Sequence, residues 1–387
     1  MLHFHIASYA YLASALTGSF AICLWARPGV RSLGGTLLLG AGFWALCGML
    51  DGGPPLCTFP AFLGLGSLGT SALTALWSGP GQRQSSLDTC LTASMFPLFL
   101  VLAGFSLAVT SVVHPKTYDL FLYAFDEQLG GQPSFLIGRI FARSAALRQI
   151  CYIGYEALPF AMAVAFAMER GRPGGHISRL MPAFAVAAAG GFLLYNLYPA
   201  AGPVHVFGTQ FPYSPPPSGA PPFRMVAVDS APRNAMPSVH IAMALLILWN
   251  SRPWPKLCRG LAGGLLAITI LATLGFGEHY LVDLFVAVPF ALLAQGLAVP
   301  DVPWRNAARA AAVAAGGLAV AAWLIYLRLP SPPLESNGAL AWSLLAGSAV
   351  AALFLEARLH SAGAQTGLPA PGRVIEREYA ARLRAPG

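Results

Sequence analysis

The stretch NAMPSVHIAMALLILW, residues 234–249, places a serine and a histidine at the head of a run of apolar residues. Pro237 suits the first position of a helix, because its missing N–H group would have no partner there anyway. Ser238 and His240 then fall in the first turn, where free backbone N–H groups and the positive end of the helix dipole favour an anion. This segment therefore predicts an anion site at the start of an apolar helix.

A second stretch, GEHYLVDLFVAVPFALL at residues 277–293, repeats the arrangement. His279 and Asp283 are four residues apart, so both lie on one face of a helix. A carboxylate one turn from an imidazole can hold the proton on one ring nitrogen, which leaves the other nitrogen as a nucleophile or a base. Either motif alone is also compatible with an interfacial histidine or a buried hydrogen bond, but the two together favour a functional site.

Membrane helices are expected to position these residues. Only 10% of the 387 residues are charged and 56% are hydrophobic, whereas a soluble domain carries about 25% charged residues. Helices of about 20 apolar residues cross the hydrocarbon core. The eleven candidate spans are residues 5–26, 33–50, 56–78, 90–113, 150–168, 180–199, 237–250, 259–275, 280–299, 307–327 and 338–355. The sequence thus predicts an all-α polytopic membrane protein with about eleven transmembrane helices.

The arginine and lysine residues of the loops predict the orientation. With the N-terminus outside, 16 of them fall on the inner side and 7 on the outer side, as the positive-inside rule favours. Both histidine motifs then open to the extracytoplasmic side. We expect a multi-pass protein of the plasma (inner) membrane with an outer active site, an outer N-terminus and a cytoplasmic C-terminus. No basic region precedes the first apolar segment, which is expected to be an anchor and not a cleaved signal.

Two long outer segments interrupt the apolar pattern. Residues 114–149 alternate apolar and polar residues at helical spacing, which is typical of helices lying in the membrane interface. Residues 200–236 contain eight prolines, which remove backbone donors and prevent a helix, so we expect an ordered cap or lid without a membrane span. The predicted organisation is N-terminal transmembrane helices in residues 1–89, a six-helix catalytic core in 90–299, two C-terminal transmembrane helices in 300–355 and a cytoplasmic tail in 356–387.

The residue types of the two motifs suit a phosphate ester presented by the outer leaflet, since two imidazoles, one carboxylate and two helix N-termini converge there. The six cysteines contain no CxxC pair and lie mostly in apolar segments, so neither a disulfide framework nor a zinc site is expected. The arginines form no stripe, which gives nucleic-acid binding little support.

The motif MPSVHIA, followed about forty residues later by HYLVD, resembles the type 2 phosphatidate phosphatase superfamily. The stretches YNLYPAAGPVHVFG (195–208) and TYDLFLYAFDEQLGG (117–131) are similar to its branch of fungal-type inositol phosphorylceramide synthases. The resemblance covers residues 90–299, which is the size of that family's helical core.

The resemblance implies roles for four residues. His279 would be the nucleophile that forms a phosphohistidine, and Asp283 would orient it and stabilise its charge. His240 would protonate the leaving alkoxide, while Ser238 and nearby amides would hold the phosphoryl oxygens. Water, a polyol or a lipid alcohol would then accept the group. The resemblance implies no metal and no other cofactor, because positioning and electrostatics suffice for this chemistry.

The chain departs from the superfamily in the cations that bind phosphate. The family's lysine and arginine patterns are missing, and Thr273 stands six residues before His279, where an arginine is expected. Arg233, Arg148 and Arg143 are the candidates to replace these cations, since the arginine fork suits phosphate oxygens. Each is otherwise expected to contact a lipid headgroup or to form an ion pair within a loop.

Glu156 and Tyr152 share one helical face and are weaker candidates for contacts with a polar headgroup. Glu156 could instead pair with an arginine. Together these residues predict a membrane-embedded enzyme that moves a phosphoryl group or a phospho-headgroup from a lipid to an alcohol or water. Inositol phosphate, in sphingolipid metabolism, is one such headgroup. A plain lipid phosphate or pyrophosphate phosphatase is the alternative within the same chemistry.

Two further classes of function stay open. A proton-coupled transporter would use Glu156, the two histidines and Asp283 as an intramembrane relay. It would place its site near the midplane, whereas both histidines fall next to outer loops. A metal-dependent hydrolase would bind its ion with His240, His279, Asp283 and Glu278, but the sequence has no HExxH or similar ligand spacing.

Overall fold

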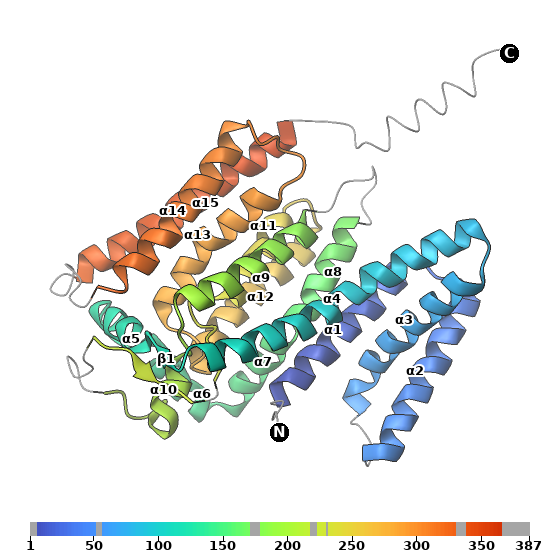
Figure 1. Ribbon diagram of the computed structural model, residues 1–387, viewed down its shortest axis with the longest axis horizontal. Helices are drawn as coiled ribbons and strands as arrows, with labels where there is room; N and C mark the ends of the chain where they lie inside the picture. The colour runs from blue at the N-terminus through green and yellow to red at the C-terminus, as the bar shows by residue number, and fades with distance from the viewer. Residues whose placement is uncertain are drawn as a thin grey trace. The chain divides into compact units, whose positions relative to one another are not determined.

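The structure is a computed structural model that describes residues 6–51, 56–170, 179–216, 223–229, 231–329 and 338–365. Within these residues it is almost wholly helical, and the described strands are β1 (Lys116–Thr117) and β2 (Val226–Ala227), which pair antiparallel. Each predicted apolar segment coincides with a helix or with two consecutive helices (Figure 1). The chain is therefore an all-α polytopic membrane protein, as predicted.

Eight helices of the described chain are long and apolar enough to cross a membrane. They are α2 (Val30–Asp51), α3 (Phe59–Trp77), α4 (Pro80–Val113), α9 (Leu180–Leu197), α12 (Lys256–Gly275), α13 (Leu281–Ala298), α14 (Ala307–Tyr326) and α15 (Gly338–Gln365). The consecutive helices α7 (Ala145–Glu156) and α8 (Leu158–Arg170) pass the same test together, as one bent span. Two shorter apolar helices are residues Tyr9–Trp25 of α1 (Ile6–Trp25) and the whole of α11 (Val239–Asn250). The figure of eleven crossings therefore stays a prediction.

The described residues form two compact units. The first falls within Met1–Phe105 and Glu156–Arg172, and the second within Ser106–Tyr155 and Pro173–Gly387. The first unit contains α1, α2, the 3-10 turn η1 (Leu56–Thr58), α3, most of α4 and α8. Glycines allow close helix packing here, because a Cβ on Gly64 would fall 2.0 Å from the carbonyl oxygen of Leu16. Small residues commonly permit such approaches in membrane helix bundles.

The second unit is built around α13, which packs against α9, α11, α14 and α15 (Figure 1). Of the candidate span of α13, 72% is buried, against 33% or less for the other seven long helices. A membrane helix enclosed on all sides can place polar groups away from lipid. The centre of this unit is therefore the place where the chain can hold ionisable side chains.

Charged side chains complement both ends of α13. The carboxylates of Asp126 and Asp283 accept backbone N–H groups at its start. At its end the buried guanidinium of Arg309 donates to the carbonyl oxygens of Gly296 and Leu297, each at 2.9 Å. Anions at a helix N-terminus and cations at its C-terminus are favourable, because they satisfy unpaired backbone groups and oppose the dipole.

The segment of residues 114–149 is helical, as its spacing predicts. It forms α5 (Asp119–Gln128), α6 (Pro133–Arg143) and the start of α7. Whether these helices lie in the membrane interface stays a prediction.

In its described residues the proline-rich segment carries no membrane-spanning helix, as expected, but short helical turns are present. It contains the short helix α10 (Pro203–Phe207), with Pro203 at its first turn, and the 3-10 turn η2 (Gly208–Gln210). Proline is compatible with the first turn because its missing N–H group has no helical partner there. Residues 217–222 and 230 of the predicted cap lie outside the described residues.

The last helix is longer than predicted. Helix α15 continues to Gln365, ten residues past the expected end of the last span. The remaining part of the predicted tail, residues 366–387, lies outside the described residues.

Candidate active site

The side chain of His279 is held in one orientation in the loop between α12 and α13. The residue is buried, and its Nδ1 lies 2.7 Å from the main-chain carbonyl oxygen of Ala235. Oδ2 of Asp283 lies farther from Nδ1, at 3.5 Å. A carbonyl oxygen can only accept a hydrogen bond, so Nδ1 carries the proton and Nε2 presents a lone pair.

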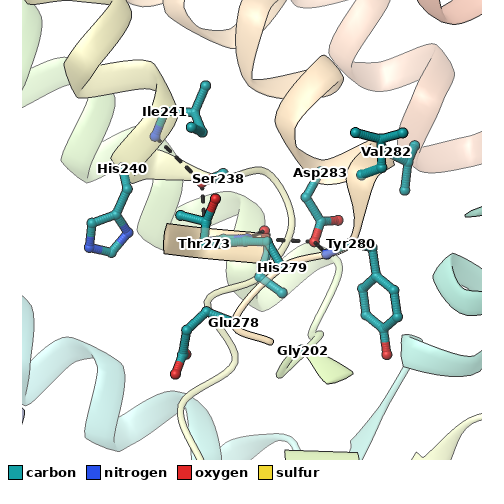
Figure 2. A network of polar contacts seen from close by, with 12 residues as sticks. Gly202, Ser238, His240, Ile241, Thr273, Glu278, His279, Tyr280, Val282 and Asp283 are labelled. Atoms are coloured by element: carbon teal, nitrogen blue, oxygen red, sulfur yellow. Dashed lines mark hydrogen bonds and ion pairs between the residues drawn. The ribbon is translucent and has the colours of Figure 1, made fainter. Parts of the chain in front are cut away.

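The hydroxyl group of Ser238 lies against this lone pair. Ser238 is the N-cap of α11, and its Oγ accepts a hydrogen bond from the N–H group of Ile241 at 3.4 Å. The same oxygen lies 3.1 Å from Nε2 of His279, so the hydroxyl hydrogen points to the ring nitrogen (Figure 2). Pro237 precedes this cap, so it does not occupy the first helical position expected from the sequence.

His240 lies beside His279, with 6.3 Å between the two ring centroids. Its imidazole stacks on the ring of Tyr155 from α7, with centroids 4.6 Å apart and an angle of 25° between the planes. Nδ1 of His240 is 3.4 Å from the phenol oxygen of Tyr155. The structure thus brings both predicted histidines and Ser238 together at the start of α11 (Figure 2).

Hydrogen bonds to the main chain fix the loop that carries His279. The N–H group of His279 donates to the carbonyl oxygen of Thr273 at 3.2 Å, and Oγ of Ser134 donates to the carbonyl oxygen of His279 at 2.7 Å. The hydroxyl group of Thr273 bonds to the carbonyl oxygen of Thr269 within α12. The position where the superfamily has arginine therefore supplies no cation, and its carbonyl group supports the loop instead.

Two buried carboxylates of α5 hold the surrounding loops. Asp119 accepts hydrogen bonds from the N–H groups of Ala201 at 3.0 Å and Gly202 at 2.7 Å. Asp126, two turns farther along the same helix face, accepts those of Leu281 at 2.6 Å and Val282 at 3.1 Å. Sequence reasoning missed both aspartates. Two aspartates seven residues apart on one face of a helix, separated by six apolar or aromatic residues, are the signal that could have found them.

These contacts change the expectation for the start of α13. The sequence suggested that the N-termini of both histidine helices could bind phosphate. In the structure the N–H groups of Leu281 and Val282 bind Asp126, and that of Tyr280 binds Asp283 at 2.7 Å. Burial raises the pKa of Asp126 well above its usual value, which these backbone contacts partly oppose. The first turn of α11 is therefore the better of the two anion sites.

Arg233 lies in the cap, with its guanidinium fully buried. Nε donates to the carbonyl oxygen of His114 at 2.8 Å, and the two terminal nitrogens donate to Ala231 and Val228, each at 2.5 Å. Burial lowers its pKa, and the nearby carboxylates of Asp119 and Asp229 oppose that effect. These contacts support a role in holding the cap together and leave the side chain no described contact with His279 or His240.

The other two candidate arginines lie on exposed surface near α7. Arg143 ends α6, and Arg148 lies in the second turn of α7. Arg148, Tyr152 and Tyr155 share one face of α7 by their spacing of four and three residues. The ring of Tyr152 packs edge-on against Phe276, 6.3 Å away between centroids. The face that carries Arg148 is thus the face that reaches His240.

Glu156 is buried at the end of α7 and belongs to the other compact unit, so its contact with a headgroup stays a prediction. Among the residues that the structure describes, no three His, Cys, Asp or Glu side chains are arranged to hold a metal ion.

The cap contacts the loop that carries His279 through a second ionisable pair. Nε2 of His205 in α10 lies 3.5 Å from Oε2 of Glu278, the residue before His279, and both side chains are about 30% exposed. Burial lowers the pKa of His205, but the carboxylate of Glu278 outweighs this and the net shift is upward. Gly202 has φ +96°, and a Cβ there would fall 2.3 Å from the carbonyl oxygen of Glu278. Only glycine fits this close approach.

Comparison with known proteins agrees with this geometry. The family model of the PAP2 superfamily matches residues 120–297, which include both histidine motifs and nearly all of α5 and α13. Neither the curated proteins nor the solved structures contain a significant match. The match supports placing this region of the chain in the type 2 phosphatidate phosphatase superfamily.

Proposed function

We propose that this protein is a membrane-embedded phosphotransfer enzyme that acts on lipid phosphates through a phosphohistidine at Nε2 of His279. The observation that carries the proposal is the tautomer and the orientation of that imidazole ring. Its Nδ1 proton is committed to the carbonyl oxygen of Ala235, so the Nε2 lone pair is directed to the hydroxyl of Ser238 at the start of α11. The superfamily match supports a phosphatase-type activity and favours an enzyme over the transporter alternative.

In the first step Nε2 attacks the phosphorus atom, an N–P bond forms and the bond to the leaving oxygen breaks. His240 donates a proton to the leaving alkoxide, which is otherwise a poor leaving group. The imidazole of His279 then carries positive charge. The carboxylate of Asp283 at 3.5 Å compensates that charge.

In the second step His240, now neutral, takes a proton from water or from an alcohol. The new P–O bond forms, and the N–P bond breaks to restore His279. The separation of 6.3 Å between the two rings leaves room for a phosphoryl group, since reacting atoms approach to about 3–3.5 Å. Ser238 and the first turn of α11 hold the phosphoryl oxygens.

The cation that the superfamily motif supplies elsewhere is assigned here to Arg148, with Arg143 as a second candidate. Arg148 shares the helix face of Tyr155, whereas the guanidinium of Arg233 is occupied by three carbonyl groups. We expect Arg148→Ala to lower kcat/KM for a lipid phosphate about tenfold or more, as for loss of a charged hydrogen bond. Exposed Arg83, in the other unit, provides the matched control Arg83→Ala. An unchanged kcat/KM in Arg148→Ala would refute this assignment.

The acceptor is proposed to be an alcohol, so that the enzyme transfers a phospho-headgroup such as inositol phosphate. Support comes from the resemblance of residues 117–131 and 195–208 to inositol phosphorylceramide synthases, because both stretches contribute to the site through Asp119, Asp126 and the loop before α10. Plain hydrolysis is the alternative, with water in the same place.

One experiment tests both the phosphotransfer activity and the identity of the acceptor. Purified protein in detergent is supplied with labelled lipid phosphates, with and without inositol or a lipid alcohol. Label in a new lipid or in inositol phosphate indicates transfer, and label only in free phosphate indicates hydrolysis. We expect His279→Ala to abolish either product. Turnover retained in that variant would overturn the proposed function.

A further inference from the structure

Tyr155 contacts His240 through both a ring face and a ring nitrogen. The two rings are stacked, with 4.6 Å between their centroids and 25° between their planes. The phenol oxygen simultaneously lies 3.4 Å from Nδ1 of His240. One residue therefore constrains both the plane of the imidazole and its Nδ1 atom.

We propose that Tyr155 is a positioning residue for His240. It holds the imidazole so that Nε2 can donate a proton to the leaving group in the first step and take a proton from the acceptor in the second. This inference rests on the proposed function, because it assigns Tyr155 to the proton transfers of that mechanism.

A phenol suits this role because its hydroxyl group both donates and accepts. When His240 is protonated, Nδ1–H donates to the phenol oxygen and Nε2–H faces the substrate. After the proton moves from Nε2 to the leaving alkoxide, the contact with Nδ1 persists and Nε2 has the lone pair that the second step needs. The contact thus serves both protonation states of His240 without a change in ring position.

The ring face adds a second effect, because the stacked phenol ring holds the imidazole of His240 in one plane while the proton moves.

The backbone of α7 holds Tyr155 firmly. On the same helix Gly154 packs against Ile268 of α12, where a Cβ would fall 2.4 Å from that side chain. Tyr155 also joins the cluster around Phe141, Cys151 and Ala272, and its ring lies 6.5 Å from that of Phe276. Phe276 is three residues before His279, so the same packing that positions Tyr155 extends to the catalytic loop.

Leaving-group dependence separates this role from a purely structural one. An alkoxide needs protonation to leave, whereas 4-nitrophenolate does not. We expect Tyr155→Phe, which keeps the ring but loses the hydroxyl, to lower kcat for an alkyl lipid phosphate about five- to tenfold, the effect of one hydrogen bond. With 4-nitrophenyl phosphate, the rate constant of the nitrophenol burst, which measures formation of the phosphohistidine, should change less than about twofold. Tyr155→Leu, which also loses the ring, should show a larger loss with the alkyl substrate and the same small change in the burst.

The control for the substitution itself is Tyr9→Phe, at an exposed tyrosine of α1 in the other unit; it should change neither rate. Equal losses of the alkyl rate and the burst in Tyr155→Phe would indicate a structural role, and no loss in either would show that the contact is idle; both results overturn the inference. Failure of the proposed function is recognised separately, by His279→Ala retaining the burst. Size-exclusion profiles and thermal unfolding of each variant show that the protein is folded.

Discussion

At the scale of single residues, the proposed chemistry depends on which group accepts the hydrogen bond from Nδ1–H of His279. The sequence pairs this histidine with Asp283, but the nearer acceptor of Nδ1–H is the carbonyl oxygen of Ala235, at 2.7 Å against 3.5 Å. The tautomer is therefore set by the main chain. The carboxylate of Asp283 has a different task, since its Oδ2 caps the N–H group of Tyr280 and provides negative charge near the ring.

This division of roles predicts a moderate effect for Asp283→Asn. The amide oxygen can still accept from Tyr280, and Ala235 still fixes the tautomer, so only charge compensation is lost. We expect kcat to fall about ten- to a hundredfold, the value of a hydrogen bond to a charged group. Loss of tautomer control in a catalytic triad costs about 10⁴-fold. Steady-state kinetics decide the point, and a loss of that larger size in Asp283→Asn would show that Asp283, and not Ala235, sets the tautomer.

His205 and Glu278 predict a weak dependence of stability on pH. The pKa of His205 is raised in the folded protein, above the value of about 6.5 in an unfolded chain. The pair therefore stabilises the fold fully below about pH 6.5, and the contribution is lost as pH rises through the raised pKa. Because both side chains are partly exposed, the effect should stay below about 1 kcal/mol.

Thermal unfolding of the wild type and of Glu278→Gln in detergent, at pH 5.5 and 8.5, measures this contribution. The difference between the two proteins should be present at the lower pH and vanish at the higher one. A difference that grows with pH would contradict the assignment.

At the scale of elements, α5 connects the cap to the start of α13. Asp119 holds the loop before α10, and Asp126 holds the first turn of α13. The ring of Phe125, next to Asp126, packs edge-on against Trp323 and Tyr326 of α14. This helix thus fixes where α13 begins, and with it the position of Asp283 under His279.

Replacing Asp126 tests this connection. Asp126→Ala leaves the N–H groups of Leu281 and Val282 buried without their acceptor, which should lower the free energy of unfolding by about 1–3 kcal/mol and reduce kcat. Asp126→Asn keeps one acceptor oxygen and should fall between the alanine variant and the wild type. Denaturation in mild detergent together with kinetics gives both quantities. Wild-type stability in Asp126→Ala would show that α13 does not depend on this cap.

Comparison of the sequence predictions with the structure shows which features depend on local pattern. Apolar length predicted the positions of the membrane helices, and the spacing of polar and apolar residues predicted helices in residues 114–149. The pairing of the two histidine motifs was also predictable, because each motif begins an apolar helix that faces the same side.

Features that depend on the main chain or on distant packing were not predictable. The acceptor for His279 is a carbonyl group, and every residue type carries one, so Ala235 gave no signal. Arg233 precedes His240 by only seven residues, but its side chain is drawn to the carbonyl groups around β2 and the end of α4. Tyr155 reaches His240 only through the packing of α7 on α12, which no local pattern encodes.

At the scale of the whole molecule, the orientation in the membrane follows from the loop charges alone and remains a prediction. Green fluorescent protein fused to the C-terminus should fluoresce, as expected for a cytoplasmic end. A cysteine introduced at exposed Tyr213 in the cap should react with a membrane-impermeant maleimide in intact cells. Fluorescence absent from the fusion, with the cap cysteine protected until the cells are opened, would reverse the assigned orientation.

The central claim is that Nε2 of His279 becomes covalently phosphorylated. The most direct measurement is rapid quenching of the enzyme with a ³²P-labelled lipid phosphate, followed by mapping of the label. The account predicts label on His279 that is stable in base, labile in acid, formed within one turnover and missing in His279→Ala. It also predicts that His240→Ala accumulates this label from 4-nitrophenyl phosphate, because the second step lacks its base. Rapid turnover of the substrate without label on His279 at any time would contradict it.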